Sequence, residues 1–269
     1  MLHRLALRLA AIEALCPFAS IGSGPYPTIA GDRVFDSRQD AIDTLAEDEA
    51  RPILVVYTEC QEDHRFGSGS RDLDESIIDL TIEAVMAVKG SVDIEQADGS
   101  VETIGTVGAP FTDPRHEAYL DLLEAGVRYA LSRQNITPEG LVFNGLAMEL
   151  RSGRSDPQRS PDKTVKLALR TIELKIKTKT TEWPAAATPA ASGLDALPQP
   201  LRDVAQGLPA GSPGRMLCEE LAGFMPNTPA LPATLDGITI YAGMGRLPDP
   251  GTPATTADVI ATEPPRADL

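Results

Sequence analysis

The sequence predicts an α+β fold: a mixed or antiparallel sheet of about four to five strands, two main helices packed on it, and a Pro/Ala-rich C-terminal extension. Three observations predict it. Residues 53–57, ILVVY, form a continuous β-branched and aromatic run of strand length, and residues 76–88 alternate apolar with polar residues. Residues 2–15 and 113–134 instead carry apolar residues at helical spacing.

The chain opens with an amphipathic segment that predicts a helix over residues 2–15, ending before Pro17. Arg8 and Glu13 interrupt its apolar residues, so we do not interpret the segment as a secretion signal. No segment of the sequence approaches 18 consecutive uncharged apolar residues, which argues against a membrane span. The apolar stripe of the predicted helix over residues 2–15 consists of Leu2, Leu5, Leu9 and Ile12.

The stretch from Ile29 to Cys60 organises the first half of the chain. A turn at Gly31-Asp32 leads into a short strand at Val34-Phe35, and an acidic connector then ends on Arg51-Pro52. The run 53–57 follows as a buried strand, with Pro52 tolerated at its first position.

This order of segments resembles the tail terminator (tail completion) proteins of tailed bacteriophages: a leading helix, AGDRVFDSR, an acidic spacer and RPILVVYT. The resemblance covers roughly residues 1–182 and consists of structural rather than catalytic residues. It implies a homo-oligomeric ring, expected to be a hexamer, that caps the head-proximal end of the tail tube. The implied partners are other copies of the chain, the tail-tube protein and a neck or head-completion protein.

The same resemblance implies a place in the virion, at the tail and neck, after synthesis in the bacterial cytoplasm. DNA would pass through the bore without specific binding, and neither a membrane nor a cofactor is involved. Family members commonly end near the strand that closes here at Lys179, so residues 183–269 are a departure. Sheath or collar protein is a further candidate partner for that extension.

The sequence pattern in the middle of the chain predicts a sheet with one buried face and one solvent-exposed face. In the strand over 76–88, Ile78, Leu80 and Ile82 alternate with polar residues, and we expect them to share one core with Ile53, Val55 and Tyr57. Residues 91–104 predict a hairpin turning at Asp98-Gly99.

Three further segments complete the domain. Residues 113–134 predict a long helix, while residues 140–153 fit a strand or a helix, with glycines slightly favouring the strand. Residues 163–179 predict the last strand. Their apolar phase changes near Arg170-Thr171, which predicts a bulge or bend there.

A composition break after Trp183 predicts a domain boundary, with residues 1–182 as the α+β domain and 183–269 as an extension with little regular structure. The extension holds 14 of the 23 prolines. Within it, residues 214–225 predict a short helix and residues 237–241 a short strand, and the chain after Pro248 is expected to be disordered.

The overall charge excludes a nucleic-acid-binding surface over most of the chain, because 24 basic residues face 39 acidic ones and the formal net charge is −15. The three cysteines, Cys16, Cys60 and Cys218, lie far apart and lack CxxC spacing. They predict buried or free thiols rather than a disulfide framework, and their odd number leaves pairing between subunits as an alternative.

No motif predicts catalysis. Cys60 and His64 are competent zinc ligands, but no second Cys/His pair has a suitable spacing, so we interpret residues 61–75 as a solvated polar loop. Nucleophile elbows and phosphate-binding glycine patterns are missing from the sequence. We therefore predict that the protein is not an enzyme. The alternatives are another neck, connector or baseplate protein, or an acidic enzyme with a dispersed site.

Two charged segments are the candidate ring or partner interfaces. The first segment has charges that alternate along an exposed strand, and such charges can orient a neighbouring subunit. An ordinary solvent-exposed strand face explains the same pattern equally well. The second segment is the main basic feature of an acidic chain. It is suited to binding an acidic partner protein; alternatively, its basic residues pair across the sheet with Asp79 and Glu83. The residues are Arg33, Asp36 and Arg38 in the first segment and Lys166, Arg170, Lys175 and Lys177 in the second.

Overall fold

The computed structural model describes residues 2–37, 52–64, 75–86, 88–95, 101–108, 113–159, 168–182 and 192–225. The chain divides into a compact unit, Met1–Pro232, and a second unit, Ala233–Leu269. The second unit lies outside the described residues, so the fold below is that of the first.

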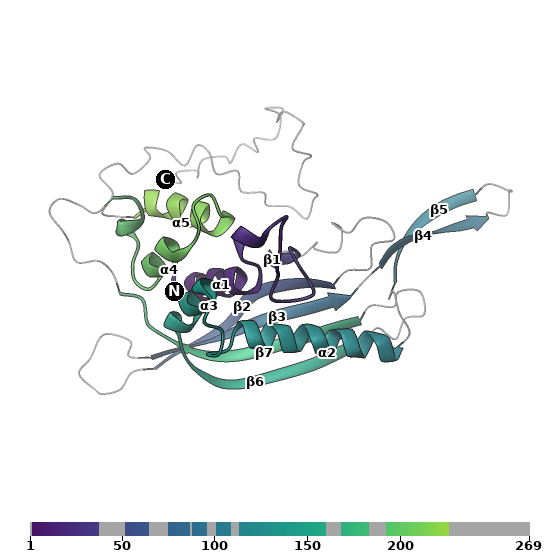
Figure 1. The fold of residues 1–269 in the computed structure, drawn as a ribbon, viewed down its shortest axis with the longest axis horizontal. Helices are drawn as coiled ribbons and strands as arrows, with labels where there is room; N and C mark the ends of the chain where they lie inside the picture. The colour runs from purple at the N-terminus through teal and green to yellow at the C-terminus, as the bar shows by residue number, and fades with distance from the viewer. Residues whose placement is uncertain are drawn as a thin grey trace, which may run out of the picture. The chain divides into compact units, whose positions relative to one another are not determined.

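A five-stranded mixed sheet forms the centre of this unit, with strand order β1-β2-β3-β7-β6 (Figure 1). β1 runs parallel to β2, and the remaining neighbours are antiparallel. The sheet and its helices confirm the α+β prediction. The strands are β1 Val34–Asp36, β2 Pro52–His64, β3 Glu75–Met86, β6 Ala147–Arg159 and β7 Ala168–Thr178.

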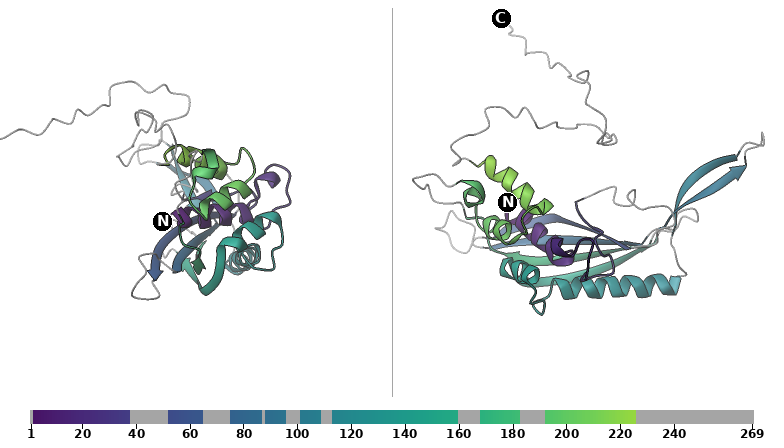
Figure 2. Two further views of the ribbon diagram at one scale, coloured as in Figure 1. Left: turned by 90° about the vertical axis from the view of Figure 1, so that its left-hand side faces the viewer. Right: turned by 45° about the horizontal axis from the view of Figure 1, so that its top comes forward.

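Helices cover one face of the sheet, as the views in Figure 2 show. α1 spans Leu2–Leu15, as predicted, and α2 spans Asp113–Ala130, four residues shorter than predicted. Apolar residues from both helices join alternate residues of the strands in the main core. The strand residues in this core are Leu54, Val56, Ile78, Leu80, Ile82, Ala84, Met86, Ile172, Leu174 and Ile176.

The expected core was wrong for β2. Ile53 and Val55 do not join Leu80; they form a small cluster on the opposite face with Val85, against which Phe35, Tyr57 and Leu169 pack. The register explains this, because Val56 lies opposite Ile82 while Val55 lies opposite Glu83. A continuous apolar run offers both faces of the strand for burial, so periodicity could not select the right one.

The predicted bulge near Arg170-Thr171 is also wrong. β7 pairs with β3 in unbroken register from Ala168 to Thr178, and the irregularities lie in β6, between Ala147 and Glu149 and between Leu150 and Ser152. The apolar phase changes because Arg170 occupies a helix-facing position in line with Ile172, and Leu169 packs on the opposite face.

The ambiguous segment 140–153 contains both kinds of element. α3 spans Pro138–Leu146, with the Thr137 hydroxyl accepting a hydrogen bond from the Gly140 amide as its N-cap, and β6 begins at Ala147. The predicted hairpin is confirmed as a separate two-stranded sheet of β4, Val88–Glu95, and β5, Val101–Gly108. Its turn lies outside the described residues.

β2 is longer than predicted and runs on to His64, so residues 61–64 belong to a strand rather than to a loop. Pairing with the first residues of β3, from Glu75 to Ile78, accounts for this extension of polar sequence. The remainder of the predicted loop, residues 65–74, is not among the described residues.

The boundary predicted after residue 182 differs from the fold. A short 3-10 helix (Gly193–Ala196), α4 (Leu201–Gly207) and α5 (Pro213–Gly223) contribute buried residues to the main core. The helix predicted over 214–225 is therefore confirmed, but as part of the compact unit. Prolines lie between and at the starts of these short helices, where a missing amide costs little, so high proline content did not mean loss of structure. The strand predicted at 237–241 lies outside the described residues.

Candidate functional site

Arg170, a predicted interface residue, lies at the contact between β7 and α2 and is only 7% exposed. Its guanidinium donates to three carboxylates of α2: Nη1 lies 2.6 Å from Asp121 and 3.0 Å from Glu124, and Nη2 lies 2.9 Å from Glu117. Burial alone would raise the pKa of Glu124, but hydrogen bonds from Ser155, Arg128 and Arg170 outweigh it and lower the pKa. Arg170 therefore holds α2 to the sheet from within the chain.

Lys175 and Lys177 are also engaged within the chain. The ammonium of Lys175 lies 3.7 Å from the carboxylate of Asp79, which is the cross-sheet pairing considered for this strand. Lys177 lies 2.8 Å from Glu75, whose other oxygen lies 2.9 Å from Arg151. Lys166 is outside the described residues. In the described part of the basic strand, Arg170 is thus paired with carboxylates of α2, and Lys175 and Lys177 are paired with carboxylates of β3.

The other predicted interface segment connects α1 to the edge of the sheet. Asp36, at the end of β1, lies 2.5 Å from the guanidinium Nε of Arg8 in α1. The carbonyl of Arg33 accepts a hydrogen bond of 2.9 Å from the amide of Leu54 in β2. Arg38 lies outside the described residues. Both placed residues therefore help to assemble α1, β1 and β2.

The possible zinc ligands lie in the second half of β2. Cys60 is exposed, and His64 lies 3.8 Å from Glu62. In the part of the chain that the structure describes, no group of three or more His, Cys, Asp or Glu side chains could hold a metal ion. Cys16 and Cys218 are buried and free, and burial raises the pKa of each thiol to about 11. They are therefore unreactive thiols of the core.

Sequence reasoning missed a buried polar network at the start of α1. The ring of His3 lies between the hydroxyls of Ser76, 2.9 Å from Nε2, and Thr181, 2.6 Å from Nδ1. Ser76 donates its own proton to Asp63 at 2.7 Å, so Nε2–H donates to Ser76 and Nδ1 accepts from Thr181. This order differs from a catalytic triad, in which the imidazole accepts the serine proton, and Ser76 is fully buried. The network joins α1 to β2, β3 and the segment that follows β7.

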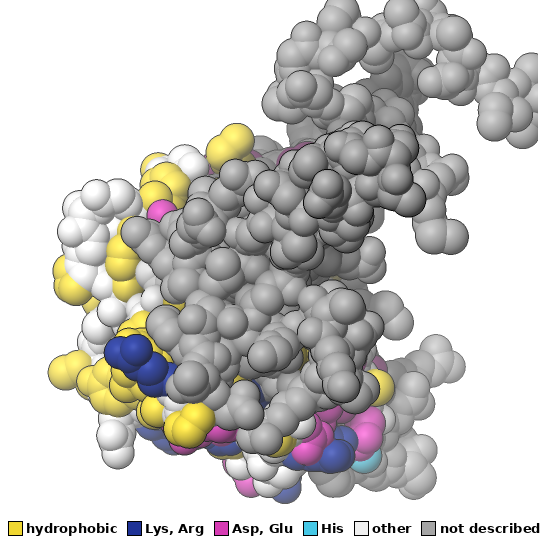
Figure 3. Space-filling view, turned by 90° about the vertical axis from the view of Figure 1, so that its right-hand side faces the viewer, with side chains coloured by type: hydrophobic (Ala, Val, Ile, Leu, Met, Phe, Trp, Pro, Cys, Tyr) yellow, Lys and Arg dark blue, Asp and Glu magenta, His cyan; other side chains and the backbone are white. Residues whose placement is uncertain are grey.

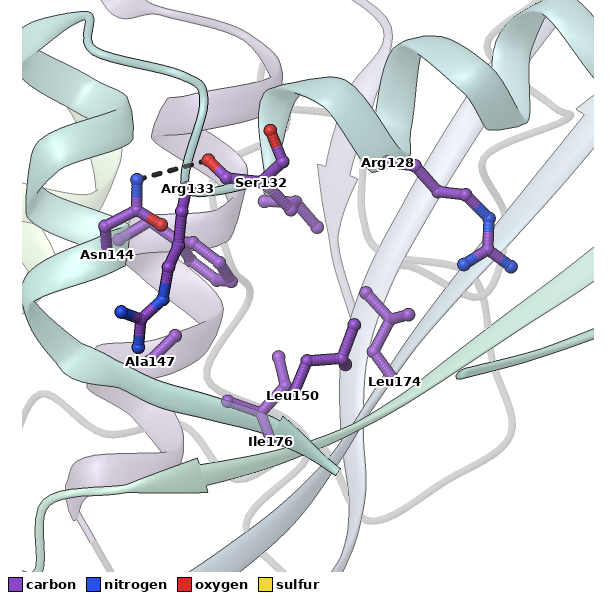
Figure 4. Close-up of a pocket in the computed structure, with 10 residues that line it drawn as sticks. Arg128, Ser132, Arg133, Asn144, Ala147, Leu150, Leu174 and Ile176 are labelled. Carbon is purple, nitrogen blue, oxygen red and sulfur yellow. Dashed lines mark hydrogen bonds between the residues drawn. The ribbon is translucent and has the colours of Figure 1, made fainter. Parts of the chain in front are cut away.

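The sequence also gave no sign of a pocket of about 280 Å³ where α2, α3, β6 and β7 meet. Its floor is apolar, and its rim carries two arginines and the amide of Asn144. Figure 4 shows Arg128 and Arg133 on opposite sides, with Leu150, Leu174 and Ile176 between them. Asn144 donates 3.2 Å hydrogen bonds to the carbonyls of Ser132 and Asn135, and Arg133 donates to the carbonyl of Met148. Such a pocket suits an apolar group next to a carboxylate.

Comparisons with known proteins do not assign this chain to a family. Among the described helices, none is long and apolar enough to cross a membrane. No protein-family model matches the chain, and no curated protein matches its sequence.

Proposed function

We propose that this protein is a virion structural protein that caps the head-proximal end of a phage tail tube as a ring. In this role it ends tube polymerisation and provides the joint to the neck and head. The observation that carries the proposal is the segment order over residues 1–58: a leading helix, AGDRVFDSR, an acidic spacer and RPILVVYT. The proposal has no catalytic step.

The described parts of that segment form one structural unit, which supports treating them as a single motif. The guanidinium of Arg4 in α1 donates to the carbonyls of Thr58 and Glu59 in β2, at 2.6 and 2.5 Å. Arg8 of the same helix holds Asp36 of β1. The charged residues of the motif thus fix the position of α1 on the first two strands. The motif therefore determines the structure of the domain rather than a catalytic site.

The mechanism is steric. A head-to-tail polymer of identical rings has no intrinsic end, so a different ring must cap it, matching the tube on one side and presenting another surface on the other. With a net charge of −15, the ring would also repel the DNA phosphates that pass its bore. On the face shown in Figure 3, basic and acidic side chains of the described residues are interspersed along the lower edge, which suits contacts with protein.

Deletion of the gene tests the proposal. Particles lacking the protein are expected to accumulate as separate heads and tails, with tubes or sheaths of uncontrolled length, and a plasmid copy should restore joined particles. Free tails of uniform, normal length would instead indicate a different neck protein. Normal, joined tails after deletion would overturn the proposal.

A further inference from the structure

The pocket between α2, α3 and β6 is bounded by elements that expose large apolar side chains. Each of the three elements exposes large apolar side chains, and Leu150, which lines the pocket, is 57% exposed. Clusters of exposed apolar side chains around a concave site mark protein contacts more often than scattered single residues do. Among the described residues of these elements, the exposed large apolar side chains are Tyr119, Leu122 and Tyr129 of α2, Leu141 of α3, and Met148 and Leu150 of β6; of these, Leu150 lines the pocket.

The charge at the rim selects the kind of partner. Arg133 donates to a backbone carbonyl and, among the residues that the structure describes, forms no ion pair with a carboxylate. Arg128 pairs with Glu124 at 2.7 Å, and Arg170 beside it contacts the carboxylates of Glu117, Asp121 and Glu124, so the positive charge at the rim comes from Arg133. The pocket therefore presents positive charge beside an apolar floor, and carboxylates next to an apolar side chain would complement it.

α5 presents such a group. Met216 is 59% exposed, and Glu220 lies one helical turn further on, on the same side of the helix. Glu219 lies 3.0 Å from Arg215, whereas Glu220 forms no ion pair within the described ranges. Among the residues that the structure describes, and apart from those of α2, α3, β6 and the loop between α2 and α3, the exposed large apolar side chains are Ile21, Ile29 and Met216. Of these, Met216 belongs to the helix with two glutamates beside it, and its flexible thioether fits irregular apolar pockets.

We propose that the pocket between α2, α3 and β6 binds Met216 of a second copy of this chain, with Glu220 of that copy meeting Arg133. The pocket and the Met216 face of α5 have no residue in common, so the contact is heterologous. Repeated heterologous contacts produce a ring when the rotation closes. The inference rests on the proposed ring and specifies which two surfaces form it.

A charge exchange in the full-length chain tests the contact. Arg133→Glu and Glu220→Arg should each weaken self-association at least about tenfold, measured by sedimentation velocity over a concentration series. The double variant should recover most of the loss, because the two charges are exchanged. Met216→Glu should also prevent association, and because Met216 is an exposed position on α5, the melting temperature should match that of the wild type at concentrations where the wild type is dissociated. Arg154→Glu is the matched control: Arg154 is 71% exposed and does not line the pocket.

The outcomes separate this contact from the proposed ring. A ring in the wild type that dissociates in the single variants and returns in the double variant supports the contact. A wild-type ring that persists in Arg133→Glu and Met216→Glu overturns the contact and leaves the tail-terminator proposal standing. A wild-type chain that stays monomeric at every concentration overturns both.

Discussion

The two faces of the central sheet differ in how they are buried. The helix-covered face holds a large aliphatic core that reaches from α1 through the strands to α5, and Arg170 is enclosed there by three carboxylates. The opposite face holds a cluster of three buried apolar residues, Ile53, Val55 and Val85, beside charged positions such as Lys175 and Asp79. On the helix-covered face the buried guanidinium is held by three carboxylates, whereas on the opposite face charged and apolar side chains alternate.

Adjacent valines of β2 offer the sharpest test of this difference. Val56 is fully buried in the main core, and Val55, 6% exposed, belongs to the small cluster. Val56→Asn should lower the free energy of unfolding by about 3–5 kcal/mol, since it combines lost apolar contacts with an unpaired buried amide. Val55→Asn should cost about half as much, because water can reach the amide. Urea denaturation of both variants measures this, and equal losses would contradict the comparison.

The sequence predicted the elements better than it predicted their faces. Alternation identified the helix-facing side of β3 correctly, but the unbroken run 53–57 carries no alternation, so its orientation depended on pairing with β3. The position of Arg170 was interpreted as a bulge or bend in the strand, because the burial of an arginine is explained only by its partners Glu117, Asp121 and Glu124. These partners lie about 50 residues away, a separation that local patterns cannot bridge.

The candidate sites were limited by the same lack of long-range information. Lys175 and Asp36 were correctly recognised as charged strand positions. Asp79 was one of two cross-sheet partners considered for the basic strand, and the fold pairs it with Lys175, whereas Arg8 as the partner of Asp36 emerged only from the fold. The pocket could not be predicted at all, because four separate elements supply its lining. The one local signal that bears on it is the apolar sequence around Leu150 in a segment otherwise rich in charge.

Removing the buried guanidinium should have the next largest effect. Arg170→Gln leaves Glu117, Asp121 and Glu124 close together without their common cation, so we expect a loss of about 2–4 kcal/mol in the free energy of unfolding. The variant should also raise the pKa of Glu124. Chemical denaturation at neutral pH measures the loss, and Asp121→Asn, at a carboxylate 68% exposed, is the matched milder change.

His3 should make the helix-covered face sensitive to pH. Burial lowers the pKa of His3 from 6.5 to about 4, so the unfolded chain takes up this proton at a higher pH than the folded chain does. Stability should therefore be highest above pH 6.5 and should fall as the pH drops from 6.5 towards 4. His3→Gln cannot titrate and should remove this component of the slope between those values. A wild-type stability that stays flat over that interval would contradict the buried neutral imidazole.

The smallest effect is expected on the opposite face. Lys175 is 47% exposed and its ammonium lies 3.7 Å from Asp79, so this ion pair is largely solvated. Lys175→Ala should change the free energy of unfolding by less than about 1 kcal/mol, in contrast to Arg170→Gln on the same strand. Salt screens exposed ion pairs, and in 1 M NaCl the Debye length is about 3 Å. The difference in the free energy of unfolding between Lys175→Ala and the wild type should therefore be smaller still in 1 M NaCl. A loss as large as that of Arg170→Gln would show that Lys175 is shielded from solvent, and that the two faces are buried alike.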